Sequence, residues 1–222
     1  MGKEKALAYQ LIPAARFHLL TPVFDLLCTL MGLGKGFAGR VVRAVEIPQS
    51  AQVLEAGCGT GRLAGALKLS RPDVAVIGLD ADPRILSVAQ GKAAQRDLDV
   101  KFFEGFIERM PFPDQSFDLV FSVLVLHHLP EDVKRQACRE MFRVTRPGGR
   151  AVIADFGPPH GWVATAVAAG MRWFERTAEN FAGRIPLMLR EAGFDPVREV
   201  FHTPWSITCL EAGKDLPAFA DR

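Results

Sequence analysis

The chain has 222 residues, of which 49% are hydrophobic, and a formal net charge of +2. That length can bury one good core, so we expect a single domain over 1–222. A charge this close to zero, with no basic run interleaved with aromatic residues, argues against nucleic acid as a partner.

The cysteines and the first residues bear on the compartment. The four cysteines lie far apart without a Cys-x-x-Cys pair, so we expect neither a metal site nor a disulfide framework. No secretory signal follows Met1, and the most apolar stretch, 19–33, is shorter than the roughly 20 residues that cross a bilayer. We therefore expect a soluble cytoplasmic protein, either a monomer or a homodimer.

Residues 1–46 differ in character from the rest and predict a helical cap, in which 37–46 form the last helix. From residue 52, short strand-like runs alternate with helical patterns, which predicts a parallel α/β sheet covered on both faces. The predicted elements are strand 52–56, helix 61–69, strand 74–80, helix 83–95, strands 100–104 and 117–122, helix 131–144 and strand 149–155. A lid with a long helix is expected about 157–190, and two closing strands at 197–202 and 205–211.

Local patterns support two of these helices. Asp82 before Pro83 is typical of a helix start. Between 131 and 144, apolar residues recur on one helical face, and Pro147-Gly148-Gly149 is expected to stop that helix.

The most informative motif is the run 53–61, in which an apolar strand leads into glycines at alternate positions, Gly57, Gly59 and Gly61. Glycine lacks a Cβ, so the backbone can turn sharply and approach a ligand closely. A helix begins directly after this loop. The arrangement predicts a small-molecule site at the carboxyl edge of a parallel sheet.

Five ordered signals lie between about residues 50 and 155: Glu55-x-Gly57-x-Gly59-x-Gly61, Gly78-Leu79-Asp80, the run 110–120, His127-His128 and Arg146-Pro147-Gly148-Gly149. Together they resemble a class I S-adenosylmethionine-dependent methyltransferase. The pattern is most similar to the branch with the ubiquinone and menaquinone biosynthesis methyltransferases and small-molecule or lipid methyltransferases. The resemblance implies a Rossmann-like three-layer sandwich, whose seven-stranded, mostly parallel sheet has one antiparallel strand near its edge.

A dinucleotide site is disfavoured by the same loop. The third position of that fingerprint needs glycine or alanine, and Arg62 stands there. S-adenosylmethionine has no phosphates, so a loop without a phosphate-binding lysine suits it. An NAD-dependent oxidoreductase remains the less favoured alternative.

Asp80 ends the second strand, where its carboxylate can accept hydrogen bonds from both ribose hydroxyls; the alternative is a loop or helix cap. Ala81 is expected to pack on the adenine. By resemblance, Glu55 faces the ammonium group of the cofactor, and the alternative is a carboxylate that accepts hydrogen bonds from the glycine-loop amides. Gly57, Cys58, Gly59 and Gly61 complete the expected loop.

After the third strand, relatives usually carry an acidic residue beyond a glycine, but here Phe106 follows Gly105. We therefore expect backbone groups near Phe106 and Ile107 to bind adenine, with the phenyl ring stacking; the alternative is that Phe106 is ordinary core. Ser122, at the end of the fourth strand, is expected near the reacting methyl group, or else to be a strand-end hydroxyl.

The methyl group of a sulfonium is already activated, so in-line displacement mainly needs an acceptor held close with water excluded. An acidic acceptor must also lose a proton. His127 and His128 follow the fourth strand, so one of them could act as the base or orient the acceptor; the alternative is a histidine satisfied by backbone. Asp155, at the end of the fifth strand, is the third catalytic candidate.

The sequence thus predicts methyl transfer from S-adenosylmethionine to a small acceptor, lipid-like or aromatic. A non-catalytic S-adenosylmethionine-binding module, serving as a sensor or scaffold, is the main alternative. The apolar stretch 19–33 could instead touch a membrane surface or a second subunit.

Overall fold

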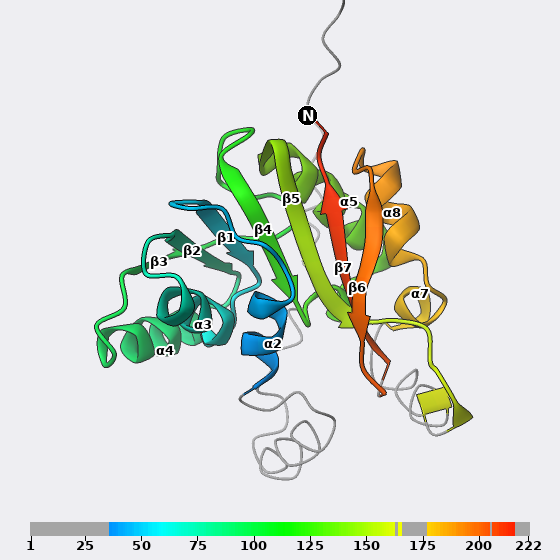
Figure 1. Ribbon diagram of the computed structural model, residues 1–222, viewed down its shortest axis with the longest axis horizontal. Coiled ribbons are helices and arrows are strands. Elements are labelled where there is room, and N and C mark those ends of the chain that lie inside the picture. Colours follow the sequence, from blue (N-terminus) through cyan, green and yellow to red (C-terminus); the bar gives the residue numbers. More distant parts are fainter. Residues whose placement is uncertain (1–35, 163, 166–176, 205, 216–222) are drawn as a thin grey trace, which may run out of the picture.

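The computed structural model describes residues 36–162, 164–165, 177–204 and 206–215. They form a seven-stranded sheet in the order β3-β2-β1-β4-β5-β7-β6 (Figure 1). All neighbouring strands are parallel except β7, which runs antiparallel to both β5 and β6. The strands are β1 (Gln52–Ala56), β2 (Ala75–Asp80), β3 (Val100–Glu104), β4 (Phe117–Val123), β5 (Thr145–Phe156), β6 (Val197–His202) and β7 (Ile207–Gly213).

Helices cover both faces of this sheet, as the alternating pattern predicted (Figure 1). One side carries α2 (Phe37–Arg43), α3 (Arg62–Ser70) and α4 (Pro83–Ala94), and the other carries α5 (Glu131–Val144), α7 (Ala178–Phe181) and α8 (Ile185–Glu191). The three-layer sandwich with one antiparallel strand near the edge is therefore confirmed.

Strand β1 lies inside the sheet and is buried on both faces. Leu54 packs toward the cluster that holds Met141 of α5, whereas Val53 packs toward the cluster that holds Leu63 of α3. Such a strand must be apolar on both faces, which explains the run that precedes the glycines. Glu55 is the one buried charged residue in this strand. A buried carboxyl group is costly unless it has a partner.

The strand order places the reversal of the chain between β1 and β4. Strands β1, β2 and β3 progress toward one edge, and β4 then returns to the other side of β1. Ligands of doubly wound sheets bind at this switch point, outside the carboxyl ends of the strands. The segments that follow β1, β4 and β5 all begin there.

The predicted start of α4 and the predicted buried face of α5 are both confirmed. The Asp82 side chain accepts a hydrogen bond from Arg84 N at 2.9 Å, and Pro83 occupies the first turn of α4. The predicted face of α5 is buried throughout, at Val133, Ala137, Met141 and Val144.

The start of β5 differs from the prediction. Helix α5 ends at Val144 as predicted, but β5 starts at Thr145, before the Pro147-Gly148-Gly149 run that was expected to stop the helix. The register between β4 and β5 shifts here, because Thr145 pairs with Phe117 and Arg150 pairs with Leu119. The run therefore bulges within the strand, where Gly148 N donates to the carbonyl of Lys214 at 2.7 Å.

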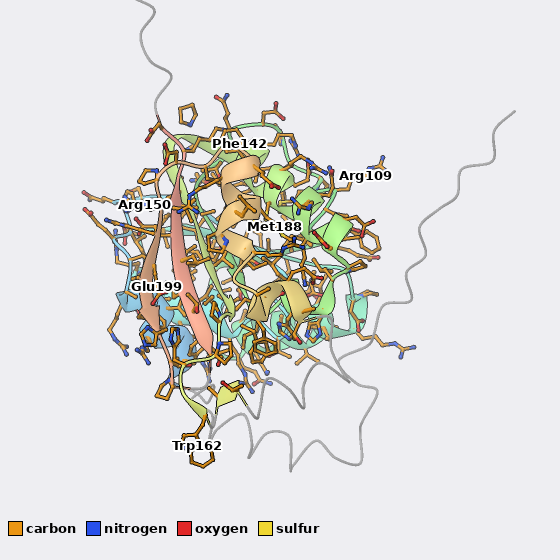
Figure 2. The ribbon with its side chains drawn as sticks, turned by 90° about the vertical axis from the view of Figure 1, so that its right-hand side faces the viewer. Arg109, Phe142, Arg150, Trp162, Met188 and Glu199 are labelled. Carbon is orange, nitrogen blue, oxygen red and sulfur yellow. The ribbon has the colours of Figure 1, made fainter. Side chains whose placement is uncertain are left out.

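The expected cap and lid are only partly within the described residues. Helices predicted before residue 36 lie outside them, as does 166–176 of the lid. Helix α8 is not a loose cover, since Ile185, Met188 and Leu189 are buried in the core beside α5. Figure 2 shows α8, with Met188 labelled, lying against the sheet. In the described part of the chain, no helix has the length and apolar character to span a membrane.

Candidate active site

The loop between β1 and α3 adopts the conformation for which its glycines were expected. Gly57, Gly59 and Gly61 have φ angles of +80°, +51° and +73°, a backbone conformation that residues other than glycine rarely adopt. At Gly57 a Cβ would also lie 2.4 Å from Cγ2 of Val125. At Gly59 a Cβ would meet no described atom within 4 Å. The Gly59 backbone is thus open to a ligand.

Backbone and carboxylate contacts hold this loop against β2. Gly57 N and Cys58 N both donate to the carbonyl of Leu79, at 2.7 and 2.9 Å. Gly59 N donates to Oδ2 of Asp80 at 2.8 Å. The loop is therefore shaped before any ligand binds, which lowers the entropic cost of binding.

Asp80 combines a structural contact with unused acceptor capacity. Its Oδ1 accepts from Asp82 N at 3.0 Å, while its Oδ2 accepts from Gly59. A carboxylate offers about four acceptor positions, so two remain for a ligand. Asp82, not Asp80, caps α4, which removes the alternative role of helix cap for Asp80.

Glu55 lies beneath the loop and is 4% exposed. Its Oε2 accepts a hydrogen bond from Ala64 N at 2.8 Å, an amide in the first turn of α3 and not in the glycine loop. Burial raises the pKa of Glu55 to about 8, although the Ala64 amide opposes the rise and nearby Asp80 adds to it. A buried carboxyl group held near its ionisation point would be stabilised as an anion by a bound cation.

The other predicted cofactor residues fall into different environments. Ala81 is half-buried beside Asp80, whereas Phe106 is 45% exposed and so is not ordinary core. Ile107 is buried. Cys58 is also buried, and burial raises the pKa of its thiol, which stays protonated. Ser122 is fully buried, and its hydroxyl has no hydrogen-bond partner among the described residues. The expected place of Ser122 near the reacting methyl group stays a prediction.

His127 and Asp155 form a buried pair beside the loop. His127 belongs to the short helix η2 (Leu126–His128), and its Nδ1 lies 2.9 Å from Oδ1 of Asp155. The two side chains are 8% and 2% exposed. Burial acts to raise the pKa of Asp155, but His127 and the Phe156 amide outweigh it, so that pKa lies below its usual range. The carboxylate is therefore ionised at neutral pH.

His128 has a different environment from its neighbour. It is exposed, and its ring centroid lies 3.9 Å from that of His127. Sequence reasoning offered the two histidines equally, and the structure pairs His127 with the carboxylate.

Asn180 of α7 also contacts Asp155, and sequence reasoning missed it. Its Nδ2 donates to Oδ1 of Asp155 at 3.3 Å, and the residue is completely buried. Nothing in the sequence pattern marks it, because it lies 25 residues after Asp155 and only packing brings the two together.

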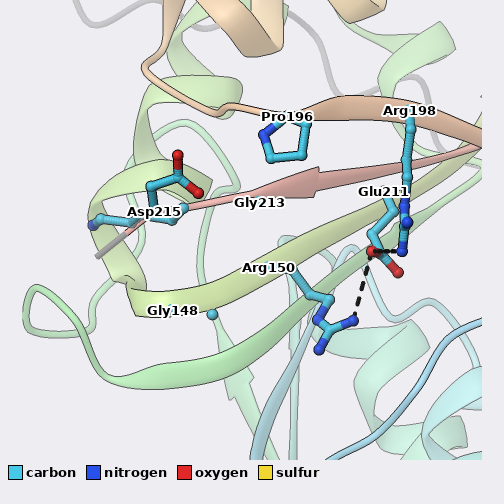
Figure 3. Close-up of a pocket in the computed structure, with 9 residues that line it drawn as sticks. Gly148, Arg150, Pro196, Arg198, Glu211, Gly213 and Asp215 are labelled. Carbon is cyan, nitrogen blue, oxygen red and sulfur yellow. Dashed lines mark hydrogen bonds and ion pairs between the residues drawn. The ribbon is translucent and has the colours of Figure 1, made fainter. Parts of the chain in front are cut away.

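A cavity of about 530 Å³ lies elsewhere, among Gly148, Arg150, Arg198, Glu211 and Lys214 (Figure 3). These residues come from the first half of β5, the start of β6 and the end of the antiparallel β7, so the cavity is at the opposite ends of the strands from the glycine loop. Arg198 contacts the buried Glu211 at 2.7 Å and Arg150 does so at 3.5 Å. Two guanidinium groups therefore face this one carboxylate.

Comparison with known proteins agrees with this geometry. A family model described as a methyltransferase domain matches residues 53–149. A demethylmenaquinone methyltransferase of Geobacillus kaustophilus is 32% identical over 196 residues, which cover 78% of this chain and 82% of that protein. The chain belongs to the class I S-adenosylmethionine-dependent methyltransferases. Within that class, it falls in the branch that contains the demethylmenaquinone methyltransferases.

Two further comparisons define how far the similarity extends. The demethylmenaquinone methyltransferase of Deinococcus radiodurans is 35% identical over 153 residues, or 68% of this chain, and the chain spans 63% of that relative's length. The structure of human N-acetylserotonin methyltransferase with S-adenosylmethionine has a TM-score of 0.72 at 18% identity, covering 94% of this chain and 60% of that one. The last similarity supports the fold alone.

A Gly59→Ala variant tests whether the open face of the loop is a binding surface. The positive φ angle should cost about 1 kcal/mol of stability. The added methyl group projects into the space left for a ligand, so affinity for S-adenosylhomocysteine should fall by about tenfold or more. Isothermal calorimetry measures the change. Gly91→Ala, in α4 and with open space at its Cβ, is the matched control and should leave affinity unchanged.

Proposed function

We propose that this chain transfers a methyl group from S-adenosylmethionine to the ring of a lipid-like hydroquinone of the demethylmenaquinol class. The observation that carries the proposal is the open backbone at Gly59 beside the two unused acceptor positions of Asp80. The named activity of the relatives supports the acceptor class. The reduced form is required, because an electron-rich ring must attack the electrophilic methyl carbon.

The residues present fit the cofactor. Asp80 would hold the ribose diol, and Gly57, Cys58, Gly59 and Gly61 would lie against the methionine part. Glu55 would face its ammonium group, since a carboxyl group buried in β1 gains a charge partner there. Ala81, Phe106 and Ile107 would contact the adenine. When bound, the sulfonium supplies a methyl group that is already activated.

The experiment incubates the purified chain with S-adenosylmethionine and chemically reduced demethylmenaquinone, and follows the product by mass spectrometry. We expect the acceptor to gain one methyl group, and the oxidised quinone to remain unchanged. Binding of S-adenosylhomocysteine without transfer to any hydroquinone or phenol would favour the non-catalytic binding module. Failure of S-adenosylhomocysteine to bind at all would overturn the proposal.

A lipid-like acceptor implies that the protein works beside a membrane, and we propose a peripheral contact through the edge after β5. Trp162 is 84% exposed there and projects away from the sheet (Figure 2). Aromatic side chains favour the membrane–water interface. Trp162→Ala should reduce flotation with anionic liposomes, whereas Leu69→Ala, an exposed apolar residue on α3, should not. Equal flotation of all three proteins would contradict the contact.

We also propose a cytoplasmic location. Cys58, Cys138 and Cys209, the cysteines within the described residues, are all buried free thiols. Such thiols persist in a reducing compartment.

A further inference from the structure

We propose that His127 is the general base that accepts the hydroxyl proton of the acceptor, and that Asp155 and Asn180 are positioning residues that hold its ring. This inference rests on the proposed methyl transfer and adds the proton acceptor that such an acceptor requires. It also assigns a role to α7, a helix that the sequence placed in a lid.

The contact with Asp155 determines which nitrogen of His127 can take a proton. An ionised carboxylate only accepts hydrogen bonds, so Nδ1 must carry the hydrogen in the contact at 2.9 Å. In the neutral ring, Nε2 then keeps the lone pair. Among the described residues, no hydrogen bond to Nε2 occupies it. The contact with Asp155 thus anchors Nδ1 and leaves the lone pair on Nε2.

Asp155 is itself held rigidly, because its two oxygens accept from five donors. The donors are the main-chain N–H groups of Val125, Leu126 and Phe156, Nδ1 of His127 and Nδ2 of Asn180. They come from the η2 segment, the end of β5 and α7. A carboxylate with this many donors cannot rotate freely, so it fixes the orientation of the imidazole.

The pair lies next to the glycine loop. The Val125 side chain fills the space where Gly57 lacks a Cβ, and His127 follows two residues later. The ring centroid of Phe156 lies 4.9 Å from that of His127, and the ring centroid of Phe181 lies 5.6 Å from that of Phe156. This aromatic wall would exclude water and suits an aromatic acceptor.

The step balances as follows. The acceptor O–H bond breaks, its proton moves to Nε2 of His127, and the electron pair stays on oxygen. The neighbouring ring carbon then bonds to the methyl carbon, while the carbon–sulfur bond breaks and leaves its pair on sulfur. Loss of the ring C–H proton to solvent restores aromaticity, and His127 returns its proton to the oxygen.

The test compares wild type with His127→Gln, Asn180→Ala and the matched control His202→Gln. His202 also pairs with a carboxylate, Glu199, at 2.8 Å, but its side chain is 50% exposed. The kinetics use reduced demethylmenaquinone at saturating S-adenosylmethionine. S-adenosylhomocysteine affinity is measured for each variant by calorimetry.

We expect H127Q to lower kcat by about 100-fold or more with unchanged S-adenosylhomocysteine affinity. Its deficit should narrow as the pH approaches about 10, where a phenolic hydroxyl ionises without a base. N180A should lower kcat by about three- to tenfold without raising KM, because it loosens the ring but removes no binding contact. H202Q should match wild type.

Two outcomes would overturn the assignment. One is an H127Q protein that binds S-adenosylhomocysteine normally and keeps kcat within about threefold of wild type. The other, decisive if H127Q does not fold, is an N180A protein with wild-type kcat at every pH. Absence of methyl transfer by the wild-type chain would instead refute the proposed function, so the two failures are distinguishable.

Discussion

Asp80→Ala is expected to weaken S-adenosylhomocysteine binding by about 100-fold or more. Each hydrogen bond to a charged group contributes roughly 1.5–3 kcal/mol, and the variant loses two such bonds to the ribose diol. The loop also loses the contact from Gly59 N to Oδ2, which should cost about 1–2 kcal/mol of unfolding free energy. Isothermal calorimetry measures the affinity, and thermal melting measures the stability.

The neighbouring carboxylate provides the matched control. Asp82→Ala removes the cap of α4, whose Oδ1 accepts from Arg84 N, so stability should fall by about 1 kcal/mol. Its affinity for S-adenosylhomocysteine should remain close to that of wild type. If D80A and D82A bind equally well, Asp80 does not hold the ribose.

Glu55→Gln is expected to change the pH dependence of stability. The pKa of Glu55 is about 8 in the folded chain, against 4.5 for an ordinary glutamate. Between these values the unfolded chain binds fewer protons, so wild-type stability falls as pH rises and levels off above about 8. Glutamine keeps an oxygen for Ala64 N but does not ionise. The variant should therefore be more stable than wild type at pH 8, as urea denaturation would show.

Glu140→Gln is the control with the opposite sign. Glu140 also accepts from a backbone amide, Met110 N at 2.7 Å, but its contact with Arg143 lowers its pKa. Its ionised form contributes stability that is present above the ordinary pKa and is lost as pH falls. Glu140→Gln should therefore destabilise the protein most at neutral pH. Identical pH trends in the two variants would contradict the raised pKa of Glu55.

The same carboxyl group predicts proton release on cofactor binding. If the ammonium group pairs with Glu55, the anion is stabilised, and binding near pH 7 should release up to about one proton. Calorimetry in buffers of different ionisation enthalpy measures this number. E55Q should release none, and an unchanged release would place the ammonium elsewhere.

Several elements were predictable because local pattern and tertiary environment agree. Strand β1 has the predicted bounds, 52–56, since an apolar run buried on both faces ends in glycines that no strand continues. The start of β5 was not predictable, because Pro147-Gly148-Gly149 is stabilised by pairing with Lys214, far along the chain. Proline and glycines were taken as a helix stop where they form a bulge.

The site divides in the same way. The glycine loop, Glu55 and Asp80 lie at the carboxyl ends of β1 and β2. These ends must meet at one edge of a parallel sheet, so the convergence of the three was predictable. Ser122 also follows this rule in sequence, yet it is fully buried. Whether a strand-end side chain faces the cleft depends on the neighbouring loops.

By itself, the sequence determined the doubly wound fold, the glycine loop and the aspartate beside it, because these depend on local periodicity and on the absence of side chains. Only the tertiary structure decided that α8 belongs to the core, and that Asp155 pairs with His127 and Asn180. Those contacts join residues 25 or more positions apart. Such pairs leave no periodic trace, because packing and burial select them after the sheet has formed.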